Sequence, residues 1–88
     1  MNGSDRDWLE ENGFKPCQGY AANARERELL DSIYEKELGD FRLAVCEEGS
    51  GYEAAATKGG ASLFGRGGTP KAAVDAVLDQ MNALGLIF

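Results

Sequence analysis

Two stretches of the chain carry apolar residues at every third or fourth position, the spacing of amphipathic helices, and capping and stop signals predict a shorter helix before them. The first helix is expected over 5–12, between a capping pattern at Ser4 and a stop at Gly13. The second is expected over 24–38: it opens at an Asn23–Glu26 capping box, and its apolar face is Leu29, Leu30, Ile33, Tyr34 and Leu38. The third begins at the cap Thr69, with Pro70 in the first position, and ends before Gly85.

Residues 41–46 alternate apolar and polar side chains, which predicts a strand. We expect 52–58 to be the return strand of a hairpin, although Ala54, Ala55 and Ala56 weaken strand propensity, and 61–66 to be a third strand centred on Leu63 and Phe64. Turn segments join them at 47–51 and at Gly59–Gly60. We therefore expect one α+β domain over 1–88, with a helix and loop over 1–22 and an α-β-β-β-α core over 23–88. Its three-stranded antiparallel sheet would have the helices packed on one face, because each helix has a single apolar stripe to bury.

This order of elements, with a glycine turn before an alanine-rich last helix, resembles the double-stranded-RNA-binding domain. The similar positions are Gly65, Gly67, Thr69, Lys71, Ala72, Ala73, Ala76 and Leu84. The resemblance implies that fold. It does not carry over the RNA ligand, because the family's lysine cluster and histidine loop are missing and Glu47 and Glu48 occupy the loop.

The segment GRGGTPKAAVDAV, residues 65–77, is also similar to the HicB-like antitoxin domain, which has a G-x-T-P-x-x-A turn before a helix. That family places its sheet before its helix and would imply a toxin as partner. The helix expected over 24–38, ahead of the sheet, favours the first resemblance.

The charge of the chain is unevenly distributed. Residues 1–53 hold 13 of the 15 acids and 6 of the 9 bases, a balance of −7, and residues 54–88 have a balance of +1. A phosphate-binding surface needs clustered bases, and the less acidic half offers only Lys58, Arg66 and Lys71. Nucleic acid is therefore a poor partner on charge, and these three bases would carry such binding as an alternative.

The residues that catalysis or metal binding requires are scarce. The chain has no histidine, and Cys17 and Cys46 lack the spacing of a zinc site, so both are expected to be passive thiols. Asp75 and Asp79 are expected to face solvent rather than hold a cation. We expect no enzymatic activity, no metal and no cofactor. The acidic start has no signal-peptide features and no apolar run reaches roughly 20 residues, so we expect a cytoplasmic protein without a membrane segment.

The glycines at 65, 67 and 68 could form an anion site at a helix start, but a left-handed turn followed by a cap is the expected structure. Trp8, Phe14 and Tyr20 are expected to pack on the domain, with Trp8 as an alternative anchor for a partner. The apolar end, Leu84 and 86–88, is expected to be covered within the chain or by a homodimer.

These features predict a small acidic module that binds a host or cognate protein with a basic surface. An inhibitor encoded by a phage or mobile element, such as an anti-CRISPR protein, is one concrete form. The expected contact residues are Trp8, Glu26, Glu28, Asp31, Glu35, Glu37, Glu47 and Glu48.

Overall fold

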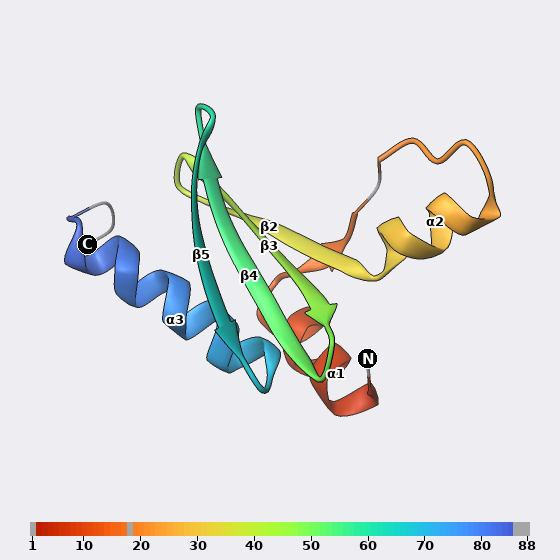
Figure 1. Cartoon of the computed structure of the whole chain (residues 1–88), viewed down its shortest axis with the longest axis horizontal. Coiled ribbons are helices and arrows are strands. Elements are labelled where there is room, and N and C mark those ends of the chain that lie inside the picture. The colour runs from red at the N-terminus through yellow and green to blue at the C-terminus, as the bar shows by residue number, and fades with distance from the viewer. Residues whose placement is uncertain (1, 18, 86–88) are drawn as a thin grey trace.

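The computed structural model describes residues 2–17 and 19–85 and has three helices and a five-stranded antiparallel sheet (Figure 1). The expected three-stranded sheet is therefore wrong, although the α+β class is right. The elements are α1 (Gly3–Glu11), β1 (Lys15–Pro16), α2 (Ala24–Asp31), β2 (Ile33–Leu38), β3 (Phe41–Glu48), β4 (Gly51–Lys58), β5 (Ala61–Gly67) and α3 (Pro70–Ala83).

Neighbours in the chain are neighbours in the sheet, whose strand order is β1-β2-β3-β4-β5. Two-residue turns join the four long strands. Glycine supplies the positive φ that these hairpin turns require at Gly39, Gly49 and both positions of Gly59–Gly60. The strands predicted at 52–58 and 61–66 are thus confirmed to within a residue at their ends, and the strand predicted at 41–46 continues to Glu48.

The helix predicted over 24–38 is wrong in its second half. Helix α2 opens at the predicted capping box, where the Glu26 N–H donates to the Asn23 side chain at 2.9 Å, but it ends at Asp31. Residues 33–38 form β2 because Tyr34 and Leu38 alternate with polar neighbours as well as fitting a helical spacing, and all six residues find partners on β3. Pairing with β3 thus selects the strand period of residues 33–38 over their helical period.

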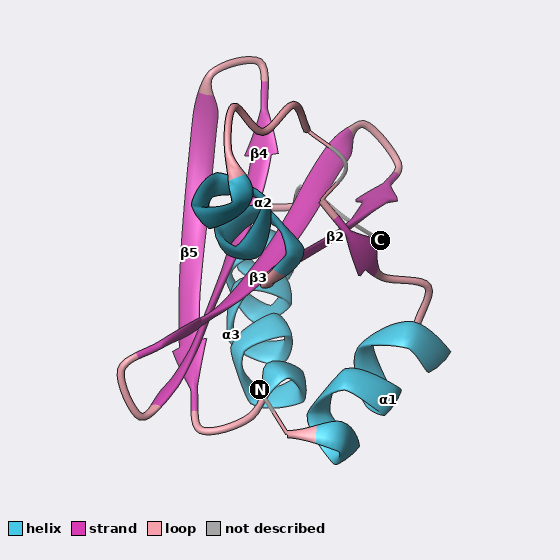
Figure 2. Cartoon of the chain, turned by 90° about the vertical axis from the view of Figure 1, so that its right-hand side faces the viewer, coloured by secondary structure: helices cyan, strands magenta, loops and turns pink. Residues whose placement is uncertain are grey.

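The helices do not all lie on one face of the sheet. Helices α1 and α3 cover one face, and α2 stands beyond the opposite face (Figures 1 and 2). We call the face under α1 and α3 the inner face and the other the outer face. The core lies on the inner face and is formed by Leu9, Phe14, Tyr34, Leu43, Val45, Tyr52, Ala54, Ala56, Ala73, Val74, Val77 and Met81.

Gly65 and Gly67 serve packing, Gly68 has free space around it, and none of the three forms a left-handed turn, which corrects the expectation for 65–68. None of the three has a positive φ. Gly65 and Gly67 are strand residues of β5, and a Cβ on Gly65 would lie 2.6 Å from the Val77 nitrogen. Because nothing larger than hydrogen fits there, α3 can lie directly on β5.

Candidate functional site

Tyr52 connects α1 to the sheet and draws acidic residues together. Its ring is buried, and its hydroxyl donates to Asp5 Oδ2 at 2.7 Å, with Glu47 Oε2 at 3.5 Å. Burial, followed by these two carboxylates, raises the pKa of Tyr52 well above its ordinary value, so the hydroxyl keeps its proton. Residues 5 and 47, far apart in sequence, thus share one donor.

Helix α1 carries most of the charge at this end of the molecule. Asp7, Glu10 and Glu11 are exposed, and Arg6 is the helix's one base. We define the acidic end as the carboxylates of α1 and of the end of β3: Asp5, Asp7, Glu10, Glu11, Glu47 and Glu48. Both segments lie at the same end of the molecule (Figures 1 and 2).

Two of these carboxylates weaken the helix that carries them. Glu10 and Glu11 occupy the last turn of α1, where no base accompanies them and the helix dipole favours positive charge. Asp7 and Glu11 are also four residues apart, a spacing at which like charges repel. Arg6, four residues before Glu10, offsets part of this cost. Helix stability therefore gives no reason for Glu11.

A crevice with a volume of about 270 Å³ opens between α1 and α3 on the inner face. Trp8 and Asn12 form its α1 side, and Glu11 follows Trp8 by one helical turn. Its surface is apolar and polar in about equal parts, and the described residues that line it are Trp8, Asn12, Phe14, Lys36, Leu38, Leu43, Lys71, Val74, Asp75 and Leu78. The crevice is large enough for one or two apolar side chains.

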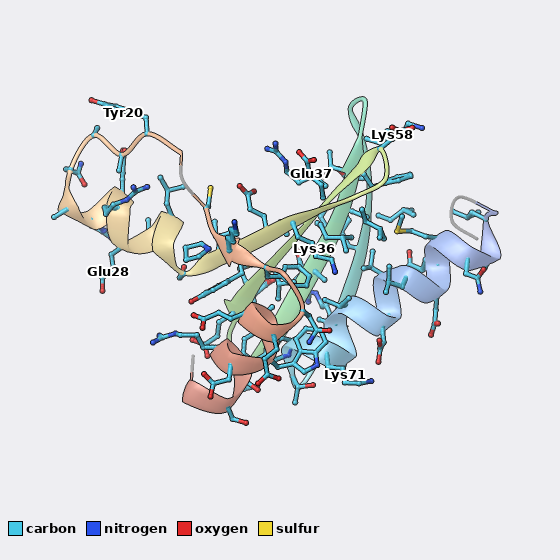
Figure 3. The ribbon with its side chains drawn as sticks, turned by 180° about the vertical axis from the view of Figure 1, so that it is seen from behind. Tyr20, Glu28, Lys36, Glu37, Lys58 and Lys71 are labelled. Atoms are coloured by element: carbon cyan, nitrogen blue, oxygen red, sulfur yellow. The ribbon has the colours of Figure 1, made fainter. Side chains whose placement is uncertain are left out.

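Lys36 and Lys71, labelled in Figure 3, reach this crevice from β2 and α3. Lys36 Nζ donates to the Asn12 carbonyl at 3.0 Å and lies 5.2 Å from the centre of the Phe14 ring. Lys71 Nζ lies 2.7 Å from Asp75 Oδ2. Both ammonium groups thus have partners within the protein, so neither neutralises the carboxylates of α1.

The structure brings together only part of the predicted partner-binding set. Trp8 is half-buried, with its ring centre 6.2 Å from that of Phe14, and it lines the crevice. Glu47 and Glu48 belong to the acidic end, where Glu48 lies 3.4 Å from Arg66. Sequence reasoning missed Asp7, Glu10 and Glu11, although four acids and one base in the short predicted helix were a usable signal.

The other predicted acids lie elsewhere. Glu26 and Glu28 are on α2, and Glu26 accepts from the Ala22 N–H at 2.8 Å as part of the cap. Asp31 ends α2, and its side chain lies outside the described part of the chain. Glu35 and Glu37 point from β2 to the outer face, and Figure 3 shows Glu37 far from Glu28.

We use the name arm for residues 19–32, which contain α2. The arm projects from the body (Figure 1) and exposes two large side chains, Tyr20 at 90% and Leu29 at 61%. The expectation that Tyr20 packs on the domain is therefore wrong, whereas Phe14 is buried as expected. Residues 86–88 of the apolar end lie outside the described residues, and Leu84 is 62% exposed.

The three bases of the nucleic-acid alternative do not form a patch. Lys58 lies at the opposite end of the molecule from Lys71 (Figure 3). Each of the three bases lies close to a carboxylate. Lys58 is 3.5 Å from Asp40 and Arg66 is 3.0 Å from Glu53, and Lys71 pairs with Asp75 as described above. A phosphate backbone would have to displace these carboxylates one by one.

The remaining chemistry of the described residues is sparse. Within 2–17 and 19–85, no three cysteine or acidic side chains gather as a metal site requires, and no helix combines the length and apolar composition needed to cross a membrane. Burial and the neighbouring Glu53 and Glu48 raise the pKa of the Cys46 thiol, which makes it a weak nucleophile near neutral pH.

Comparison with protein-family models, with curated proteins and with solved structures finds no match to this chain. The resemblances to the double-stranded-RNA-binding domain and to the HicB-like antitoxin domain therefore stay predictions. The preference for the first depends on a helix over 24–38, and that helix ends at Asp31. The feature that favoured the double-stranded-RNA-binding domain over the HicB-like antitoxin domain is therefore not found in this fold.

Proposed function

We propose that this protein is a non-enzymatic module that binds another protein through the acidic end and the neighbouring crevice. The partner presents an apolar side chain flanked by lysines or arginines. The apolar group enters the crevice beside Trp8, and the basic residues contact Asp7, Glu10 and Glu11.

The proposal rests chiefly on Glu10 and Glu11. Their position in the last turn of α1 costs helix stability, and an exposed cluster of like charge repels itself. A basic partner would offset this cost, because its positive charges attract the carboxylates that repel one another in the free protein. The same attraction would speed the encounter between the two proteins. The excess of four acids over one base on α1, with Glu10 and Glu11 in the turn that the helix dipole disfavours for acids, is the single observation that favours a basic partner over none.

The crevice supplies the apolar part of such an interface. Stable interfaces combine a buried apolar centre with a polar rim, and tryptophan is prominent among the residues that dominate affinity. Trp8 lies between the apolar centre and the charged rim of this surface: its ring lines the crevice, and Glu11 lies one helical turn further along α1. Charge would guide the encounter, and the crevice would slow dissociation.

Two forms of this module remain proposals. An inhibitor from a phage or mobile element would use the acidic end to occupy a basic groove. An antitoxin would bind its toxin, and the four long strands that precede the Thr69-capped helix fit the sheet-before-helix order of that family. Co-expression with the product of the adjacent gene tests the antitoxin form, because a stable complex is expected only if that product is the toxin.

Affinity capture from lysate of the source cells tests the proposal with two variants of equal charge change. Glu10→Lys/Glu11→Lys reverses the acidic end, and Glu28→Lys/Glu37→Lys reverses exposed acids elsewhere. We expect the same protein to be retained by the wild type and by the second variant, and lost by the first. Retention by the first variant, or loss of the captured material after nuclease treatment, contradicts the proposal.

A further inference from the structure

Strand β5 forms one edge of the sheet, and no strand of the described residues pairs with its outer side. The Gly59–Gly60 turn closes the β4–β5 hairpin at the pair Lys58 and Ala61. In an antiparallel ladder, alternate residues then direct their N–H and C=O groups toward β4, beginning with Ala61. Ser62, Phe64 and Arg66 therefore direct theirs outward, and the Gln80 side-chain amide indeed donates to the Phe64 carbonyl.

We propose that β5 pairs with β5 of a second copy of this chain, antiparallel, with Phe64 on the two-fold axis. The outward-facing residues 62, 64 and 66 are symmetric about Phe64, so the edge is complementary to itself. Ser62 faces Arg66 of the second copy, and Phe64 faces its own equivalent. Each of these pairs exchanges two main-chain hydrogen bonds and joins two sheets into one.

The side chains of β5 favour this register. Phe64 lies in the middle of the strand and is 56% exposed on the outer face, where the two-fold axis would place two phenyl rings directly opposite each other. Facing aromatic pairs stabilise antiparallel strands. Arg66 meets Ser62 rather than another arginine, so no like charges stand opposite across the new ladder.

The charge of the molecule also selects this side for self-association. Two copies of a chain with a net charge of −6 repel each other through most of their surface. Strand β5 carries no acid and a single base, Arg66. On α3, Ala72 and Ala76 pack against Gly67 and Gly65, Gln80 reaches the Phe64 carbonyl, and Asp79 is the acid next to Gln80 in the chain. The crevice lies on the opposite flank of α3, so the dimer leaves it open.

Gln80 competes with the second copy for one acceptor. Its amide occupies the Phe64 carbonyl, which in the dimer accepts from the Phe64 N–H across the axis. Because Gln80 is exposed, its side chain can turn to solvent when the strands pair. We expect Gln80→Ala to tighten the dimer about 25-fold, a factor of about five for each of the two hydrogen-bond acceptors that it frees.

Sedimentation equilibrium of the full-length chain tests the pairing. We expect the 9.4 kDa chain to form dimers in a concentration-dependent way. Phe64→Lys should yield monomers, because it removes the aromatic pair and places two like charges at the axis. Ala44→Lys is the matched control: it adds the same charge on the outer face of the central strand β3, two strands away from β5, and should leave the dimer intact.

A second set of variants tests the register itself. Ser62→Glu places a carboxylate opposite Arg66 of the other copy twice and should tighten the dimer several-fold, whereas Ser62→Arg should weaken it by a similar factor. Ser62→Pro removes an outward N–H without affecting the β4 ladder and should weaken the dimer, with Ser62→Ala as control. Circular dichroism establishes that each variant is folded.

The results separate this proposal from its competitors. A chain that stays monomeric at millimolar concentration overturns it. A dimer that survives Phe64→Lys but is lost on Leu84→Lys would place the interface at the apolar end and also overturns it. Equal effects of Ser62→Glu and Ser62→Arg contradict the register. The capture experiment above is unaffected by any of these outcomes.

Discussion

Replacing Gly65 by alanine tests whether the glycines before α3 serve packing. The added Cβ would lie 2.6 Å from the Val77 nitrogen, 2.8 Å from the Ala73 carbonyl oxygen and 2.9 Å from the Ala76 Cβ. Ordinary contacts of this kind are about 3.5–4.0 Å, so α3 would have to move away from β5 by about 1 Å. Helix backbone cannot yield as a flexible side chain can.

We expect this displacement to cost ~1–3 kcal/mol of unfolding free energy, the usual range for an overpacked core. In a domain of this size that corresponds to a fall in Tm of roughly 5–20 °C. Thermal unfolding followed by circular dichroism measures it. The helix content at low temperature should be unchanged, because α3 keeps its cap and its apolar stripe.

Gly68→Ala is the matched control. No atom lies within 4 Å of a Cβ at Gly68 and its φ is not positive, so alanine should fit there without strain. The less flexible unfolded chain should then raise stability by ~0.4–1 kcal/mol. Equal stabilities of the two variants would refute the packing argument and reopen the possibility that the glycine segment binds a ligand.

Three further predictions concern single side chains. Tyr52→Phe removes the hydroxyl shared by Asp5 and Glu47 and should cost ~1–3 kcal/mol, measured by urea unfolding; unchanged stability would contradict the link between α1 and the sheet. The folded state holds the pKa of Tyr52 above its ordinary 10.0. Above about pH 10 the unfolded chain therefore releases this proton first, and the free energy of unfolding should fall by up to ~1.4 kcal/mol per pH unit. Tyr52→Phe should lack this loss. Leu29→Ser on the arm should change stability by less than ~0.5 kcal/mol whereas Leu9→Ala should cost ~2–5 kcal/mol, and the reverse order would contradict the arrangement of the core. In a Cys17→Ser background the Cys46 thiol should be alkylated only at higher pH than an ordinary cysteine, and Glu53→Gln should lower that pH; no response to Glu53→Gln would mean that this carboxylate does not act on the thiol.

The elements whose signals are local could be predicted from the sequence. Thr69 and Pro70 specify the start of α3 through one side-chain bond and one fixed φ, and Gly59–Gly60 specifies a hairpin by itself. The ends of these elements accordingly lie within a residue or two of their predicted positions.

The elements that depend on distant partners could not. Residues 33–38 fit both a helical and a strand period, and only pairing with β3 decides between them. The two residues of β1 carry no pattern at all and form a strand because they meet Tyr34 and Glu35. The role of Gly65 likewise depends on α3, which packs on it from twelve residues further on.

The candidate site shows the same division. Trp8, Glu47 and Glu48 could be named from residue type, but their grouping depends on the Tyr52 hydroxyl, which connects α1 to the third strand. Glu26 has a local task as a helix cap, which a list of acidic residues does not distinguish from a contact surface. The last-turn position of Glu10 and Glu11, by contrast, follows from the stop predicted at Gly13 and could have been used from the sequence.

The central claim is that the acidic end and the crevice form the binding surface. Its most direct test is to titrate the captured partner into the isotope-labelled chain and record which backbone amides shift by NMR. We expect the shifts to concentrate in α1, at the end of β3 and around Trp8 and Leu78 in the crevice. Shifts confined to the arm and the outer face, with α1 unaffected, would contradict the account.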